Sequence, residues 1–146
     1  MYSEADKAYL AGFLDGEGSI IIDDHGGKSR LSVRVVLGNT HVGVLQELQS
    51  IWGGFFYTKQ AQKEGWKQGS VLEWATKEAV ELLREIQPYL RIKKEQCQVA
   101  LKFQETINSM AHRTKPIPLE VQSYRLELRD IMRELNHKGT RCNPKG

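Results

Sequence analysis

The sequence contains little cysteine and no long hydrophobic run, and each shortage excludes a class of protein. Its two cysteines, Cys97 and Cys142, lie far apart, outside any CxxC motif and without a nearby Cys/His pair. We therefore expect free thiols in an intracellular protein, rather than a disulfide framework or a structural zinc site. No apolar run approaches the roughly 20 residues of a membrane span, so no membrane partner is expected. Residues 1–7 lack the basic and apolar regions of a signal peptide, which predicts no export.

The composition is typical of one globular domain. The chain has 146 residues, of which 40% are hydrophobic and 27% are charged, so it can bury a core without disulfides or a metal. A formal net charge of +3 permits a polyanionic partner but is too small to identify one. The distribution of charge is more informative. Arg30 and Arg34 lie in a stretch without acids, although residues 1–40 as a whole hold four basic and six acidic residues.

Hydrophobic periodicity predicts the element order α-β-β-α-β-β-α, followed by a helical extension. Helices are expected over residues 4–15, 41–52, 76–86, 94–108 and 119–135, the last ending near Gly139, and strands over residues 19–24, 30–37, 55–59 and 70–76. Ser3 and Thr76 are expected to cap the first and third helices, and residues 25–27 to form a turn between the first two strands. The predicted class is α+β with antiparallel strands. We assign residues 1–108 to a core and residues 109–146 to a helical extension of the same domain.

The first predicted helix has two different apolar faces. One is bulky and suits the core of the domain, and it consists of Tyr9, Leu10, Phe13 and Leu14. The other is a stripe of small residues, Ala5, Ala8 and Gly12, which Asp15 or Gly16 extends. A helix that is apolar on both sides must be covered on both sides. The small stripe therefore predicts a second helix that approaches closely.

The same helix ends in the nonapeptide Leu10-Ala11-Gly12-Phe13-Leu14-Asp15-Gly16-Glu17-Gly18. Two of its residues are acids at the carboxyl end of a helix, where the dipole disfavours an anion by about 0.3–1 kcal/mol. A cation bound by carboxylate oxygens would relieve this penalty and the repulsion between the acids. Acids at the end of a helix where they are unfavourable indicate a functional site.

This nonapeptide closely resembles the motif of the LAGLIDADG homing endonucleases and the related intron maturases. The predicted element order is similar to the family's core, and Gln87-Pro88-Tyr89-Leu90-Arg91-Ile92-Lys93 resembles the family segment that ends in a catalytic lysine. The resemblance covers roughly residues 8–108. One departure is Glu17, where many members have aspartate, which keeps an oxygen ligand on a longer arm.

The resemblance implies a site-specific, intron-encoded endonuclease. It implies a saddle of two antiparallel sheets, one per motif, that lies in the major groove of a long pseudo-palindromic duplex DNA target. With one motif in this chain, the implied enzyme is a homodimer that makes staggered cuts in both strands. The implied cofactor is Mg²⁺, with Mn²⁺ able to substitute and Ca²⁺ supporting binding without cleavage. Two alternatives share the fold, namely an RNA-binding maturase and a DNA-binding regulator without catalysis.

The resemblance also assigns roles to residues. Glu17 and the backbone carbonyl of Gly16 would be the metal ligands. Lys93 would stabilise developing phosphate charge, unless it is a solvated lysine before a helix. Asn39 lies near the family's solvent-orienting position, and it is equally placed to cap the following helix. Ala8, Gly12 and Asp15 are expected at the dimer interface, Asp15 with a structural role.

The DNA-reading residues are expected on one strand face. Arg30, Ser32 and Arg34 alternate with apolar residues on the second predicted strand and form a polar face. Arginine can pair with guanine edges, and a hydroxyl tolerates several bases. In the second hairpin the weaker candidates are Tyr57, Lys59, Gln68 and Ser70, and Trp66 could contact the backbone. If Leu72 and Trp74 point inward, Glu73 points toward the nucleic acid.

Overall fold

The computed structural model describes residues 1–24, 30–60, 63–65 and 67–140, with side chains described as far as residue 137. The turn expected at residues 25–27, Trp66 and Cys142 lie outside the described residues. The elements are α1 (Glu4–Glu17), β1 (Gly18–Asp24), β2 (Leu31–Asn39), α2 (Val42–Trp52), β3 (Phe55–Thr58), β4 (Ser70–Ala75), α3 (Thr76–Ile86), the short 3-10 helix η1 (Gln87–Tyr89), α4 (Lys94–Asn108) and α5 (Leu119–Thr140). The predicted α+β class and element order are confirmed.

The strands form one antiparallel sheet in the order β1-β2-β4-β3. Because successive side chains point to opposite faces, the register divides the strands into two sets. We call the buried set the inner face; it includes Ile20, Ile22, Val33, Val35, Leu37, Leu72 and Trp74. We call the opposite set the outer face; it includes Ser19, Ile21, Asp23, Ser32, Arg34, Val36, Phe55, Tyr57, Val71 and Glu73. Leu72 and Trp74 point inward as predicted.

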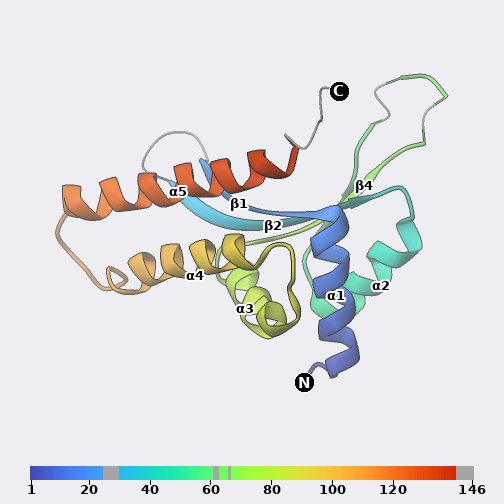
Figure 1. Ribbon diagram of the computed structural model, residues 1–146, viewed down its shortest axis with the longest axis horizontal. Coiled ribbons are helices and arrows are strands. Elements are labelled where there is room, and N and C mark those ends of the chain that lie inside the picture. The colour runs from blue at the N-terminus through green and yellow to red at the C-terminus, as the bar shows by residue number, and fades with distance from the viewer. Residues whose placement is uncertain (25–29, 61–62, 66, 141–146) are drawn as a thin grey trace.

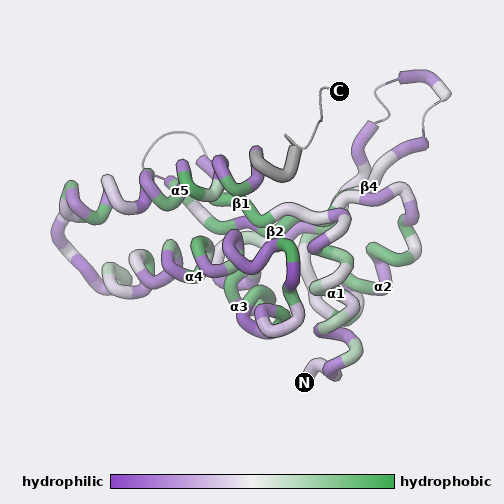
Figure 2. Tube along the Cα trace, in the orientation of Figure 1, coloured by the Kyte–Doolittle hydropathy of each residue, from purple (hydrophilic) through white to green (hydrophobic). Residues whose placement is uncertain are grey.

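Helices cover the inner face of the sheet. Leu10 and Leu14 of α1, Leu45 and Leu48 of α2, Leu83 and Ile86 of α3 and Phe103 of α4 join the strand residues in one hydrophobic cluster. Figure 1 shows α1, α3 and α4 gathered on one side of β1 and β2. In Figure 2 the hydrophobic segments concentrate where these elements meet, whereas the described part of the β3–β4 connection projects from the body and is hydrophilic.

Helix α5 extends this core beyond residue 108. Its residues Leu128 and Met132 are 3% and 1% exposed and belong to the same cluster. The side-chain amide of Asn136 donates to the carbonyl oxygen of Ile20 at 2.9 Å, so α5 also satisfies an acceptor of the edge strand β1. In the described part of the chain, no helix has both the length and the apolar character that crossing a bilayer requires.

Several local expectations need correction. Ser3 caps α1 as predicted, because its hydroxyl accepts from the Asp6 amide at 3.1 Å. Thr76 does not cap α3. The cap is Ala75, and Thr76 is the first helical residue with a φ of 54°, a strained value for a β-branched side chain. Helix α1 continues to Glu17, and α5 runs through Gly139 to Thr140.

The faces of α1 differ partly from the prediction. Leu10 and Leu14 are fully buried, but Tyr9 is 55% exposed, so its assignment to the core is wrong. Ala11 is buried in its place. Ala11 belongs to the central hydrophobic cluster, and a pattern based on large apolar residues does not reveal this.

Candidate active site and nucleic-acid interface

The two acids of the nonapeptide have different surroundings. Helix α1 ends at Gly18, whose backbone N–H donates to the carbonyl oxygen of Leu14. Glu17 is the last helical residue, is exposed, and makes no hydrogen bond or ion pair with any described residue. Gly16 is exposed beside it. The last turn of α1 therefore presents a carboxylate and a backbone carbonyl oxygen to solvent.

Asp15 is held inside the protomer. Its Oδ2 accepts from the amide of Arg91 at 2.9 Å, and its Oδ1 accepts from the amides of Ile92 and Lys93 at 3.2 and 3.0 Å. In return, Nζ of Lys93 donates to the carbonyl oxygen of Asp15 at 3.0 Å. This ammonium pairs with one of the carbonyls that a helix end leaves without a partner, and its charge offsets the negative end of the dipole. We call this set of four hydrogen bonds the Asp15 clamp.

The clamp gives Asp15 the structural role that was expected. Asp15 was also expected at the dimer interface, and this stays a prediction; within the protomer both of its carboxylate oxygens accept from amides of residues 91–93. A sequence pattern does not reveal this contact, because its partners are backbone groups 76–78 positions away.

The three predicted catalytic residues gather at one end of the sheet. Gly18 begins β1 and pairs with Leu37 near the end of β2, so Glu17 and Asn39 lie at the same end. The Asp15 clamp holds Lys93 there as well. Residues from three distant parts of the sequence thus surround the carboxyl end of α1.

Asn39 does not cap α2. The cap residue is His41, whose Nδ1 accepts from the Val44 amide at 3.0 Å. Oδ1 of Asn39 accepts from the His41 amide at 2.8 Å and thereby orients the cap residue. The side-chain amide N–H groups of Asn39 have no partner among the described residues, so they are available as donors at this end of the sheet.

The ligands offered here suit a hard divalent cation. The Glu17 carboxylate and the Gly16 carbonyl are oxygen donors, which Mg²⁺, Mn²⁺ and Ca²⁺ prefer. Within the described residues, no group of three or more His, Cys, Asp or Glu side chains is arranged to hold a metal. The donor set is thus suitable in kind but incomplete in number. A cation bound here would take further ligands from water, from a phosphate or from a second copy of the chain.

The outer face differs from the predicted basic surface at Arg34. Nη1 of Arg34 lies 2.6 Å from Oδ2 of Asp23, and Nη2 donates to Oε2 of Glu73. Strand pairing brings both acids to an arginine that has no acid near it in the sequence. Arg30, by contrast, is exposed and makes no hydrogen bond or ion pair within the part of the chain that the structure describes.

The other predicted DNA-binding residues are divided between the faces. Tyr57 is on the outer face beside Val71, and Lys59 and Gln68 are exposed at the base of the β3–β4 connection. Ser32 is on the outer face, but its hydroxyl is buried without a partner. Ser70 is 1% exposed and shares the inner face with Leu72. Ser70 was expected to contact DNA, but it is buried on the inner face, whereas Glu73 lies on the outer face as expected from inward Leu72 and Trp74.

The small-residue stripe of α1 is uncovered in the protomer. Ala5, Ala8 and Gly12 are all exposed, and Gly16 continues the stripe. A Cβ added at Gly12 or at Gly16 would meet no atom within 4 Å. The stripe is therefore not needed for packing within the protomer.

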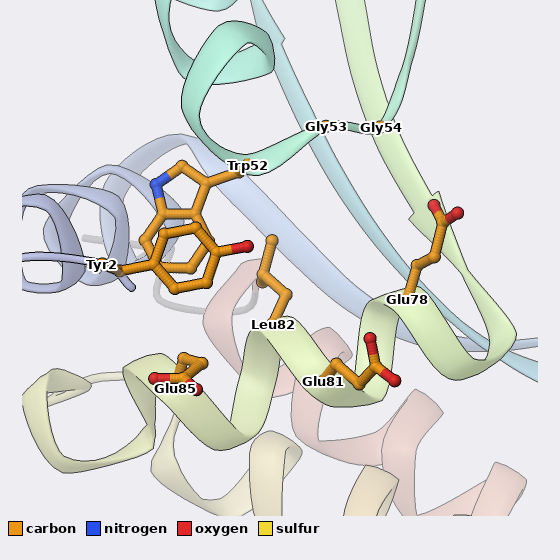
Figure 3. Close-up of a pocket in the computed structure, with 8 residues that line it drawn as sticks. All are labelled: Tyr2, Trp52, Gly53, Gly54, Glu78, Glu81, Leu82 and Glu85. Carbon is orange, nitrogen blue, oxygen red and sulfur yellow. The ribbon is translucent and has the colours of Figure 1, made fainter.

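A separate cleft lies at the other end of α1 (Figure 3). Tyr2 stacks on Trp52 with ring centroids 3.9 Å apart, and α3 lines the floor with Glu78, Glu81 and Glu85 in a cavity of about 410 Å³. Helix α1 rises about 20 Å between this cleft and Glu17. Three carboxylates there repel phosphates. The cleft therefore does not suit the nucleic acid expected from the sequence, and among the described residues its carboxylates are not arranged to hold a metal.

The described cysteine takes no part in the site. Cys97 is buried, and burial raises the pKa of its thiol to about 11. Its Sγ lies 3.9 Å from the carbonyl oxygen of Leu83. The thiol stays neutral near pH 7 and is a core residue rather than a nucleophile.

Comparisons with known proteins agree with this geometry. A family model described as a LAGLIDADG-like domain matches residues 4–108. Comparison with the sequences of curated proteins finds no match. Among solved structures, the fold is similar to that of the homing endonuclease I-CvuI in complex with its target in the presence of Ca, with a TM-score of 0.71 and 19% identity over 91% of this chain and 85% of that chain.

Two further structures show the same likeness. The archaeal intron-encoded homing endonuclease I-Vdi141I complexed with DNA matches with a TM-score of 0.72 and 14% identity, over 90% of this chain and 84% of that chain. The homing endonuclease I-GzeII in complex with its DNA target matches with a TM-score of 0.67 and 17% identity, over 84% of this chain but 43% of that chain. At these identities the likeness establishes the fold.

Proposed function

This chain belongs to the LAGLIDADG family, and we propose that it is a homing endonuclease that makes staggered double-strand cuts in a long duplex DNA target by Mg²⁺-dependent hydrolysis, as a homodimer. The observation that carries the proposal is the carboxyl end of α1. There an exposed, unpaired Glu17 follows a glycine carbonyl, and the Asp15 clamp fixes Lys93 beside them.

Each residue at this end has a role that its contacts allow. Glu17 and the Gly16 carbonyl would hold Mg²⁺, which supplies electrostatic stabilisation of phosphate oxygens and a more acidic bound water. Lys93 would stabilise the charge that develops on a phosphate bound at this end of α1. Asn39 can donate its free amide N–H groups to a water or a phosphate oxygen. None of these residues belongs to the hydrophobic core, so their polar groups are available for chemistry rather than for packing.

The nucleic-acid partner is proposed from the outer face. It carries Arg34 and Tyr57, Arg30 lies exposed directly before β2, and Lys59 and Gln68 lie at the base of the exposed connection between β3 and β4. A two-stranded or larger β-sheet can enter a major groove, and arginine reads guanine there. The similar structures of I-CvuI, I-Vdi141I and I-GzeII contain DNA, which supports a DNA partner here.

The homodimer is supported by two observations. The stripe of Ala5, Ala8 and Gly12 is exposed and unused within the protomer. This chain also matches 43% of the length of I-GzeII, which leaves room in that chain for a second unit of similar size. A pair of protomers related by a two-fold axis would recognise a pseudo-palindromic target, since both halves of the site meet the same surface.

The decisive experiment changes the charge of Glu17 without changing its shape. A duplex is first selected from a randomised library by binding to the wild-type chain in Ca²⁺, and is then incubated with the protein in Mg²⁺. We expect Glu17→Gln to cut roughly 10²- to 10³-fold more slowly, the scale of removing one group that stabilises transition-state charge. Binding in Ca²⁺ should persist, because it depends on groove and phosphate contacts.

The matched control is Glu81→Gln, another exposed helical glutamate that lies on α3 at the distant cleft. It should cut like the wild type. Equal cutting by Glu17→Gln and wild type would contradict the role given to Glu17. A wild-type chain that binds the duplex but never cuts it would favour the regulator, and one that prefers RNA would favour the maturase.

A further inference from the structure

Arg34 lies at the centre of an ion-pair network that spans three strands of the outer face. It pairs with Ile21 across β1 and with Ala75 across β4. Asp23 is two residues from Ile21, and Glu73 is two residues from Ala75, so both acids are diagonal neighbours of Arg34. Diagonal neighbours on one face of a sheet are within reach of long side chains.

Hydrogen bonds join Arg34 to both acids, one on each neighbouring strand. Nη1 of Arg34 donates to Asp23 at 2.6 Å, and Nη2 donates to Glu73. The side chains of Arg34, Asp23 and Glu73 are 20%, 29% and 17% exposed, so the three are partly desolvated. Burial alone would lower the pKa of the guanidinium, but the hydrogen bonds and charges of the two acids outweigh it and raise that pKa. The arginine is thus held as a cation in one place.

The charge of the network is unexpected for a DNA-binding face. Each carboxylate offsets the positive charge of Arg34 and so weakens its attraction for phosphates. If Arg34 served only to attract the DNA backbone, the acids would oppose it. The cost of desolvating partly buried charges offsets much of their attraction, so stability is a weak reason for the two acids.

The remaining effect of the two acids is to orient the guanidinium of Arg34. A guanidinium has five N–H donors in a planar fork. The two hydrogen bonds to Asp23 and Glu73 leave three donors and fix the plane from opposite sides. A guanidinium fixed in one plane can donate to two acceptors on one base edge, such as O6 and N7 of guanine. It is less suited to phosphates, which are contacted best by a side chain that can move.

Building on the proposed DNA-binding function, we propose that Asp23 and Glu73 are positioning residues that orient Arg34 to read a guanine edge in the major groove and withhold it from phosphates. Arg30 provides the internal contrast, since it is exposed and without a polar partner among the described residues. Arg30 is free to contact phosphates, whereas Arg34 reads sequence.

The test uses Glu73→Gln, which keeps the side-chain shape and removes one anion. Asp23 is a less clean target, because its Oδ1 also accepts from the Asp24 amide. The full-length wild type, Glu73→Gln, Arg34→Ala and Arg30→Ala each select duplexes from the same randomised library in Ca²⁺, and the selected pools are sequenced. Affinity for the unselected library is measured in parallel, and thermal unfolding verifies that each variant is folded.

Wild type should enrich a guanine at one position of each half-site. In the wild type this preference for guanine should be roughly 5- to 150-fold, the discrimination that a good bidentate contact gives. Glu73→Gln should lose much of this preference and should bind the unselected library severalfold more tightly. Arg34→Ala should lose the same preference. Arg30→Ala should keep it, bind all duplexes more weakly and show a shallower salt dependence.

A merely structural role of Glu73 predicts a different pattern, in which its variant unfolds more easily and binds every duplex more weakly. That pattern, or a folded Glu73→Gln chain with unchanged affinity and base preference, would overturn the positioning role and leave the proposed function intact. If the wild type binds no duplex, the proposed function itself fails, and the inference fails with it.

Discussion

Asp15 shows how one side chain can place another that is distant in the sequence. Its carboxylate accepts from three consecutive amides, and its carbonyl accepts from the ammonium of Lys93. The segment that these amides belong to joins η1 to α4 and has no regular hydrogen bonding of its own between Arg91 and Lys93. The position of Lys93 beside Glu17 therefore depends on Asp15.

We predict that Asp15→Asn loosens this segment. The asparagine amide group replaces one acceptor with a donor that faces a backbone N–H, which should lower the free energy of unfolding by about 1–3 kcal/mol. Cleavage should fall further than the folded fraction does, because Lys93 loses its position. Denaturant unfolding and single-turnover cleavage on the selected duplex measure the two effects.

The control for this change is Asp130→Asn. Asp130 is an exposed aspartate on α5 that pairs with its neighbour Arg129, and its substitution should alter stability by less than about 0.5 kcal/mol. If Asp15→Asn lowered stability but left cleavage by the folded protein unchanged, the clamp would be structural alone.

At the residue scale, the sequence could predict which residues carry functional groups, but not which side chains pair with them. Alternation on β2 placed Ser32 and Arg34 on one face, and the nonapeptide singled out Glu17. The partners of Arg34 could not be predicted, because Asp23 and Glu73 reach it only through the register of β1 and β4. For the same reason, alternation within β4 should have separated Ser70 from Glu73 once Leu72 and Trp74 were assigned inward.

At the element scale, helix α5 decides how far the domain extends. The family model ends at residue 108, yet α5 places Leu128 and Met132 in the central cluster and pairs Arg129 with Asp24 at 3.7 Å. Helix α5 packs along α4 and β1 and reaches no other part of the described sheet to a comparable extent. These contacts join α5 to the hydrophobic core of residues 4–108, and the assignment of residues 109–146 to the same domain stays a prediction.

We predict that Met132→Ala lowers the free energy of unfolding by about 2–5 kcal/mol, the usual cost of emptying a buried site of this size. Its matched control is Ile131→Ala, one residue away and 41% exposed, which should cost far less. Denaturant unfolding followed by circular dichroism should show one transition in both variants. An early separate transition for Met132→Ala would mean that α5 folds apart from the core.

Element boundaries were less predictable than element order, for local physical reasons. Helix α1 was expected to end at residue 15 but continues through Gly16 to Glu17, because a glycine costs a helix only about 1 kcal/mol. Helix α5 is described to Thr140, next to Gly139, where its end was expected. Thr76 was expected as a cap from its side chain, but its backbone adopts positive φ at the sharp turn from β4 into α3. Hydrophobic periodicity predicts which face of a helix or strand is buried, but it does not predict the backbone geometry where two elements join.

At the scale of the whole molecule, the uncovered stripe of α1 bears directly on activity. A protomer offers one Glu17 and one outer face, whereas a cut in both strands of a long target needs two of each. The stripe ends at Gly16, directly beside Glu17. A close pairing of two α1 helices along Ala5, Ala8 and Gly12 would therefore bring the two carboxylates near one another.

We predict that Gly12→Leu gives a folded monomer that does not make double-strand cuts. A Cβ at this exposed position meets no atom within 4 Å in the protomer, so folding should be preserved, but a leucine would hold two α1 helices apart. Sedimentation at micromolar concentration and cleavage of the selected duplex measure the outcome. The control is Gly12→Ala, which should raise the free energy of unfolding by up to about 1 kcal/mol through helix propensity, while its single methyl group still permits close approach. A Gly12→Leu chain that sediments as a dimer and cuts both strands would place the interface elsewhere, and a monomeric wild type would contradict the homodimer itself.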